Sequence, residues 1–115
     1  MKILNISLNG VRDYYQTYFE IIRPFASMTH KEAMVFATIL ELRHLSNVDS
    51  LDYRQWMDGN AIDYLLKAND ISAANYRVIL YSLKKKGFIV DYIINKVYDI
   101  RYETDGGIIF SLKQK

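Results

Sequence analysis

The stretch ISAANYRVILYSLKKKGFIV, residues 71–90, decides the fold, because it has the pattern of a capped helix that leads directly into a strand. Ser72 is suited to accept a hydrogen bond from the first turn of such a helix, and Gly87 stands where a left-handed C-terminal cap is expected. The apolar residues follow the spacing of one helix face: Tyr76, Ile79, Leu80 and Leu83. The sequence therefore predicts a helix over 73–86 with this face in the core.

The opposite side of this helix is the candidate recognition face. It carries Ala74, Val78, Tyr81 and Lys85, flanked by Arg77 and Lys84. The helix also ends in three consecutive lysines, Lys84, Lys85 and Lys86. Lysines in a last turn complement the helix dipole and keep the helix end solvated, but the same charges would attract a phosphate backbone. Both interpretations stay open at the level of this stretch.

Composition is that of a single globular domain. The 115 residues are half apolar, include one proline and no cysteine, and carry a net charge of +2. The lack of cysteine excludes disulfides, thiolate metal sites and thiol catalysis. We expect one soluble, cytoplasmic domain over 1–115, because the longest apolar run, 33–40, is too short to cross a bilayer and the first residues lack the pattern of a signal peptide.

Positive charge is concentrated towards the C-terminal end of the sequence. Residues 1–70 have 7 basic and 9 acidic side chains, whereas residues 71–115 have 8 basic and 4 acidic ones. An anionic partner is therefore expected to bind the second part of the chain.

Two elements are predicted near the N-terminus. Alternating apolar residues indicate a short strand over 3–8, and helical spacing indicates a helix over 11–26 that Pro24 ends or kinks. Polar residues follow each of these elements, so neither extends further.

A second helix is predicted over 29–45. Thr29 and Glu32 have the spacing of a capping box, in which each side chain bonds the other residue's amide. The apolar stripe of this helix is wide, so we expect it to be central and largely buried. A turn capped by Ser50 and a short helix from about residue 60 then lead into the opening stretch.

The residues after the opening stretch predict β structure. FIVDYII (88–94) is apolar and β-branched, and 98–102 and 108–112 alternate apolar with polar residues. TDGG (104–107) is a strong hairpin turn, because glycine supplies the positive φ that such turns need. We therefore predict a ribbon of two or three strands over 88–112, with its tip at 104–107 or at 95–96.

This order of elements resembles the winged helix-turn-helix superfamily, in the style of MarR-like regulators and of phage or plasmid replication and regulatory proteins. The resemblance covers residues from about 28 to 112. Its motif is Ile71, Ser72, Tyr76, Leu80, Leu83, Gly87, Phe88 and Ile89, together with the Thr29-x-x-Glu32 helix start. It implies an α+β fold with a helix-turn-helix over 60–86 and a β wing over 88–112.

The resemblance also implies a function. The helix over 73–86 would enter the major groove of duplex DNA in a small transcription or replication regulator. Arg77 and Tyr81 would lie in the groove, and Lys84, Lys85 and Lys86 would contact phosphates. Related regulators often pair through terminal helices, so the helix over 11–23 is the expected homodimer element. Val78 departs from the polar or basic residue that this family often has there.

A protein-binding module is the alternative function. The chain has 10 tyrosines, more than a core of this size needs, and aromatic residues are favoured at protein interfaces. We expect this interaction surface to include Val78, Tyr81, Tyr14 and Trp56, all at least partly exposed. The partner would be another component of a larger assembly, such as a phage particle or a replication complex.

Catalysis, cofactors and metals are not expected. His30 and His44 stand 14 residues apart, about four helical turns, so they do not form one site by themselves. The acidic pairs do not match a calcium loop, and the sequence has no phosphate-binding glycine loop.

Overall fold

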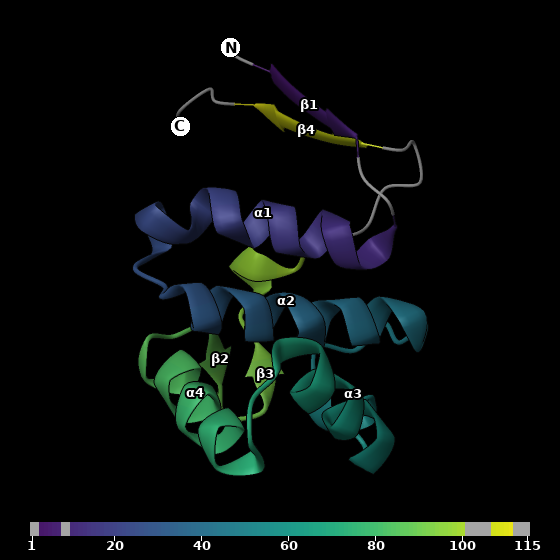
Figure 1. Ribbon diagram of the computed structural model, residues 1–115, viewed down its shortest axis with the longest axis vertical. Coiled ribbons are helices and arrows are strands. Elements are labelled where there is room, and N and C mark those ends of the chain that lie inside the picture. Colours follow the sequence, from purple (N-terminus) through teal and green to yellow (C-terminus); the bar gives the residue numbers. More distant parts are fainter. Residues whose placement is uncertain (1–2, 8–9, 101–106, 112–115) are drawn as a thin grey trace.

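The computed structural model describes residues 3–7, 10–100 and 107–111, the end strands by their backbone alone. Figure 1 shows the elements in order: β1 (Ile3–Ser7), α1 (Val11–Ala26), α2 (His30–Leu45), η1 (Tyr53–Gln55), α3 (Gly59–Asn69), α4 (Ala73–Lys85), β2 (Ile89–Val90), β3 (Ile93–Ile94), η2 (Lys96–Tyr98) and β4 (Gly107–Ser111). Helices dominate, and the described strands form two small antiparallel sheets, β1–β4 and β2–β3. The predicted α+β class is confirmed.

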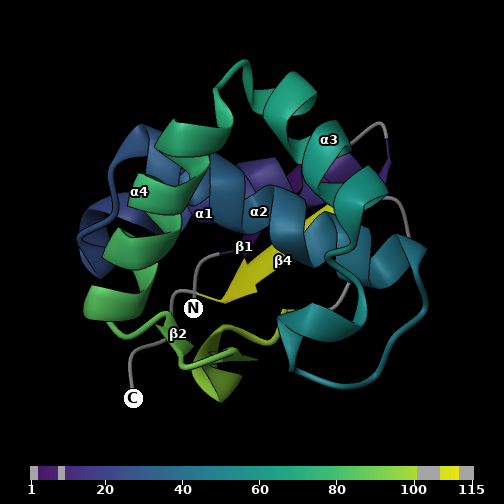
Figure 2. The same ribbon diagram turned by 90° about the horizontal axis from the view of Figure 1, so that it is seen from below.

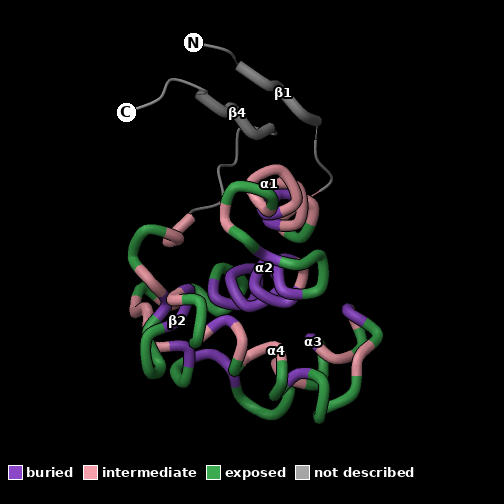
Figure 3. Tube along the Cα trace, turned by 90° about the vertical axis from the view of Figure 1, so that its left-hand side faces the viewer, coloured by how far each residue is buried: buried purple, intermediate pink, exposed green. Residues whose placement is uncertain are grey.

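The elements are stacked in layers around α2. Figure 1 shows the β1–β4 sheet above α1, α1 above α2, and α3, α4 and the β2–β3 hairpin below. Helix α2 is buried on nearly every side, as Figure 3 shows, and includes the fully buried Val35, Phe36 and Ile39. The predicted capping box starts it, with the Glu32 amide donating to Thr29 Oγ1 at 3.1 Å and the Thr29 amide to Glu32 Oε1 at 2.9 Å.

The connection between α3 and α4 has the predicted local chemistry. Asp58 caps α3, which ends at Asp70 in the left-handed conformation with φ of 51°. Ser72 caps α4 by accepting a hydrogen bond from the Asn75 amide at 3.1 Å. Gly87 follows with φ of 87°, which explains why glycine is needed where the chain turns from α4 towards β2.

The C-terminal ribbon differs from the prediction. Residues 88–94 are not one strand but a tight hairpin, because Asp91 takes a left-handed conformation with φ of 57° and turns the chain between β2 and β3. Strand β4 pairs with β1, in the register Ile3 with Ser111. Of the predicted strand over 98–102, residues 101–102 lie outside the described residues. The proposed turn at 104–107 lies mostly outside the described residues.

Residues 98–100 do not form the predicted strand because the Tyr98 side chain packs against the hydrophobic core. Its ring lies 4.8 Å from that of Phe88 and 6.1 Å from that of Phe36, between centroids. The short helix η2 brings it there, with the Val97 amide donating to the Asn95 side chain at 3.1 Å. Alternation of apolar and polar residues at 98–102 does not distinguish this arrangement from a strand.

The loop before α3 adds a further edge to the hairpin. Asp52 bridges Ile93 in antiparallel fashion, and the Ile94 amide donates to the Leu51 carbonyl at 2.8 Å. Asp52, and not Ser50, caps the helical turn η1. Helix α1 continues past Pro24 to Ala26. Across the described ranges, none of the helices combines the length and apolarity needed to cross a membrane.

Candidate functional site

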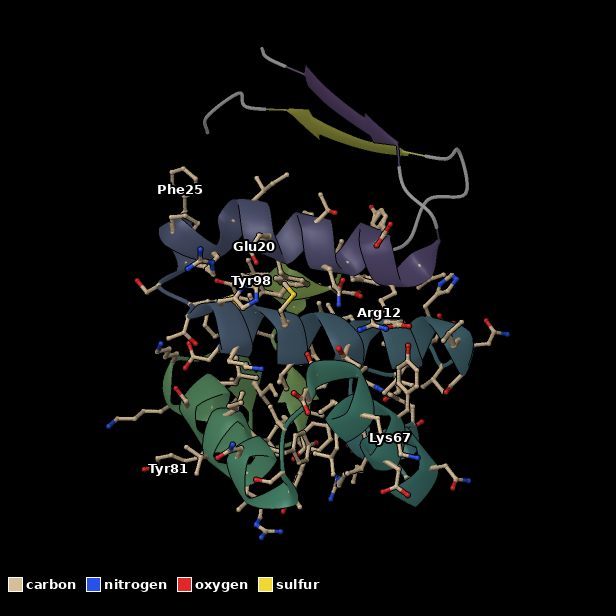
Figure 4. The ribbon with its side chains drawn as sticks, viewed as in Figure 1. Arg12, Glu20, Phe25, Lys67, Tyr81 and Tyr98 are labelled. Atoms are coloured by element: carbon tan, nitrogen blue, oxygen red, sulfur yellow. The ribbon has the colours of Figure 1, made fainter. Side chains whose placement is uncertain are left out.

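The outward side of α4 is the predicted one. Val78 and Tyr81 are each 67% exposed, and Figure 4 shows Tyr81 pointing away from the body of the protein. The other exposed side chains of this face are Ala74, Arg77 and Lys85. On the opposite side, Tyr76 and Leu83 are buried in the core, as their spacing predicted. The helix therefore presents a small, mixed apolar and basic surface to solvent.

Lys86 has a contact inside the fold that the sequence analysis did not anticipate. Its Nζ donates to Glu32 Oε1 at 2.7 Å and to the Ser27 carbonyl at 2.9 Å. Ser82 of α4 also donates to Glu32, which is only 5% exposed. Burial by itself would raise the pKa of Glu32, yet the hydrogen bonds from α4 and from the Thr29 amide hold it below its ordinary value. Lys86 therefore anchors α4 to the start of α2.

Lys84 is also engaged, at the tip of the hairpin. Its Nζ lies 5.0 Å from the ring centroid of Tyr92 and 5.8 Å from that of Tyr53. The Arg54 guanidinium lies 4.1 Å from the Tyr92 centroid and pairs with Asp52 at 2.7 Å. Cations over aromatic rings are attracted by the ring quadrupole, so these groups hold one another in place. Within the described residues, none of the hydrogen bonds, ion pairs or ring contacts involves Lys85.

A groove separates the end of α4 from the β2–β3 hairpin. Figures 1 and 2 both show β2 beside the C-terminal end of α4. The groove has a volume of about 440 Å³ and is lined by Tyr81, Lys84 and Lys85 of α4 and by residues 89–92 of the hairpin. Val90, Tyr92 and Ile93 of the hairpin are 58%, 43% and 44% exposed. We call Val78, Tyr81, Lys85 and these three hairpin residues the α4–hairpin surface.

Two residues of the predicted interaction surface are in fact buried. Trp56 is 4% exposed, and its indole Nε1 donates to the Ile39 carbonyl at 2.9 Å. Tyr14 is 6% exposed and packs edge-on against Tyr15, with ring centroids 5.3 Å apart. The expectation of exposure was wrong for both, because Trp56 bonds to α2 and Tyr14 packs against the neighbouring ring of Tyr15.

The exposed residues of the hairpin were missed by the sequence analysis. Val90, Tyr92 and Ile93 belong to the largely apolar stretch 88–94, which resembles a buried strand. Asp91 was the available signal, because aspartate in the middle of such a run tolerates the left-handed conformation of a tight turn.

The histidines and acidic side chains of the described residues are the potential ligands of a metal site. His30 is exposed and contacts Glu20, with His30 Nδ1 2.8 Å from Glu20 Oε2. In the part of the chain that the structure describes, no three His, Asp or Glu side chains gather closely enough to hold a metal ion. A cavity of only about 50 Å³ lies beside Arg43, whose guanidinium pairs with Asp99 at 2.5 Å.

Comparisons with family models, with curated proteins and with solved structures gave no match. The α4–hairpin surface is therefore interpreted from its own geometry and chemistry.

Proposed function

We propose that the chain is a winged helix-turn-helix protein that binds duplex DNA through α4, as a small regulator of transcription or replication. Helices α3 and α4 would be the helix-turn-helix and the β2–β3 hairpin its wing. The observation that carries this proposal is the exposed outer side of α4, where Ala74 permits close approach to DNA and Arg77 and Lys85 face solvent.

The contacts of the lysines refine the predicted DNA-binding residues. Lys85 stays available for a phosphate, whereas Lys86 is paired with Glu32 and Lys84 is held over aromatic rings. Arg77 would read a base edge and Tyr81 would contact the groove wall. Few free cations mean few phosphate contacts, so the salt dependence should be shallow for a DNA-binding protein.

A duplex titration at two salt concentrations tests this function. We expect measurable affinity for a mixed-sequence duplex at low salt, falling with a slope of about −0.9 per phosphate contact. Lys85→Ala should reduce that slope by about one contact, whereas Lys96→Ala on η2 should leave it unchanged. Arg77→Ala, at the proposed base-edge reader, should weaken binding by about 1–3 kcal/mol and relax the sequence preference. Lack of binding at low salt would remove DNA from consideration.

A protein-interaction module in a larger assembly is the second candidate function. It is favoured by the exposed apolar side chains Val78, Tyr81, Val90 and Ile93, since single-chain soluble proteins rarely expose a contiguous apolar patch without use for it. Val78→Asp combined with Tyr81→Ala should abolish co-purification with the partner. Val97→Asp is the matched control, because Val97 is 76% exposed and lies outside the surface. Equal loss in both variants would contradict this candidate.

A further inference from the structure

We propose that the groove between α4 and the hairpin binds a short segment of a partner protein that has one large apolar residue flanked by acidic residues. The groove volume of about 440 Å³ lies in the range of pockets that hold a ligand, roughly 300–1,000 Å³. Its walls come from two elements, so it is a feature of the tertiary structure.

The apolar part of the segment is indicated by the groove walls. Tyr81 stands on one side and is 67% exposed, while Val90 stands on the other and is 58% exposed. Both surfaces would lose water on contact with an apolar side chain inserted between them, which is favourable in proportion to the area covered. Aromatic residues at such positions bring a large contact area with little loss of conformational entropy.

The acidic part of the segment is indicated by charge. Lys84 and Lys85 line the same groove, and Asp91 is the single acidic residue among its lining. The Lys84 ammonium is already positioned by the rings of Tyr92 and Tyr53, so little side-chain entropy remains to be lost when it meets a carboxylate. Exposed lysine–carboxylate pairs add little affinity, but they orient the bound segment and disfavour the binding of basic segments.

Protein is favoured over nucleic acid as the occupant of this groove. Protein–DNA interfaces are strongly polar and positive, whereas this groove places the apolar and aromatic side chains of Tyr81, Val90 and Tyr92 beside its two lysines. A partner bound here would cover Tyr81 and Lys85 and would therefore compete with duplex DNA on α4. The inference does not depend on DNA binding, since the groove belongs to the free chain.

Peptide titration of the full chain, without DNA, tests the proposal. The probe is the blocked peptide acetyl-DEGFDD-amide, compared with acetyl-KKGFKK-amide, which keeps the apolar residue, and with acetyl-DEGADD-amide, which keeps the charge. Amide chemical shifts are followed by NMR. We expect the first peptide alone to shift the amides of Tyr81, Lys85 and Val90, with a Kd of about 1 mM or tighter.

Matched variants separate the groove from general surface effects. Lys85→Glu should weaken binding of the acidic peptide by roughly three- to tenfold. Lys96→Glu makes the same charge change on η2 and should leave the affinity unchanged. Val90→Asp should weaken it by at least about tenfold, and Val97→Asp should have no effect. Lys85→Glu should also gain measurable binding of the basic peptide.

Several results would overturn the proposal. These are no shift at about 1 mM peptide, equal binding of the basic peptide, or equal effects of the groove and control substitutions. A single-stranded oligonucleotide that shifts the same amides when the peptide does not would assign the groove to nucleic acid. The peptide titrations contain no DNA, so their results can be interpreted even if the protein does not bind the duplex.

Discussion

Three neighbouring lysines have three different environments because successive residues of a helix point about 100° apart. Lys84 faces the hairpin and lies over Tyr92, Lys85 faces solvent, and Lys86 turns back towards Glu32. A cation paired with a buried carboxylate contributes to the fold, and an exposed cation is available for a partner. At the residue scale, then, one run of identical residues divides between stability and binding.

Replacement of Lys86 should therefore destabilise the fold. Lys86→Ala should lower the free energy of unfolding by about 1–2 kcal/mol at neutral pH, because Glu32 loses a charge-assisted hydrogen bond. Lys85→Ala is the matched control and should change the free energy of unfolding by less than about 0.5 kcal/mol. Urea denaturation measures both. Equal effects of the two variants would contradict the assignment of Lys86 to the fold.

The same contact should be sensitive to acid. The pKa of Glu32 is lowered in the folded state, so its contribution is present above the unfolded value of about 4.3 and is lost as the pH falls through the folded value. The difference in unfolding free energy between Lys86→Ala and the wild type should accordingly narrow as the pH falls below the unfolded value and Glu32 becomes protonated in the folded state.

Glu41 is a buried carboxyl with the opposite behaviour. It is 4% exposed, and Tyr64 Oη donates to its Oε2 at 2.7 Å, while its Oε1 has no hydrogen-bond partner within the described structure. Burial raises the pKa of Glu41, despite the hydrogen bond from Tyr64. The ionised form therefore opposes folding, and this loss of stability grows as the pH rises from about 4.3 through the raised value.

Glu41→Gln should consequently stabilise the protein. We expect the free energy of unfolding to rise by about 1 kcal/mol at neutral pH, because the amide keeps an acceptor for Tyr64 without a buried charge. The gain should shrink as the pH falls below about 4.3, because the wild-type carboxyl then becomes protonated in the unfolded state as well as in the folded state. If Glu41→Gln is less stable than the wild type at neutral pH, the buried Glu41 carboxylate is stabilised by its surroundings, and the prediction is wrong.

At the scale of elements, the β2–β3 hairpin is too short to be stable alone, since isolated two-stranded hairpins are marginal in water. Residues 51–53 support it through the Asp52–Ile93 bridge and the Tyr53 amide, which donates to the Tyr92 carbonyl at 3.0 Å. Arg54 and Lys84 hold the Tyr92 ring from two further elements. The hairpin is thus positioned by η1 and α4.

Loss of the Tyr92 ring should loosen this hairpin. Tyr92→Ala removes two cation–π contacts worth about 0.5–1 kcal/mol each at exposed sites, and Tyr92→Phe keeps them. Hydrogen exchange of the Ile94 amide, which bonds to Leu51, should be faster in Tyr92→Ala and unchanged in Tyr92→Phe. Tyr81→Ala is the aromatic control outside the cluster. If the Ile94 amide exchanges as slowly in Tyr92→Ala as in the wild type, the backbone hydrogen bonds alone are sufficient to hold the hairpin in place.

At the scale of the whole molecule, α1 lies between α2 and the β1–β4 sheet, as Figure 1 shows. This position leaves less of α1 open for the homodimer than the sequence suggested. The end of the helix is the exception, because Phe25 is 89% exposed and points away from the body in Figure 4. The homodimer stays a prediction, and its proposed contact moves from residues 11–23 to the last turn of α1, where Phe25 lies.

Sedimentation equilibrium tests whether the protein forms a homodimer through the last turn of α1. If α1 pairs with a second copy through its last turn, the wild type should sediment as a dimer. Phe25→Ser should then shift it to monomer, because burial of an exposed phenylalanine stabilises an interface by about 1.5–3 kcal/mol. Val97→Ser, at a similarly exposed apolar residue on η2, should remain dimeric. A monomeric wild type would contradict the homodimer.

Local chemistry was readable from the sequence alone. Ser72, the Thr29–Glu32 capping box and Gly87 act within a few residues along the chain, so their hydrogen bonds and φ angles follow from local order. Helical spacing likewise placed Tyr76 and Leu83 in the core, because a face of one helix is defined by that helix.

Partners distant in sequence were decided by the tertiary structure. The pairing of β4 with β1, the contact of Lys86 with Glu32 and the burial of Trp56 join residues that no local pattern connects. Each depends on which surfaces meet after the helices have packed, and apolar periodicity does not encode that choice. For this reason the α4 helix was predicted from its own residues, whereas the groove beside it exists only because the hairpin folds back against α4.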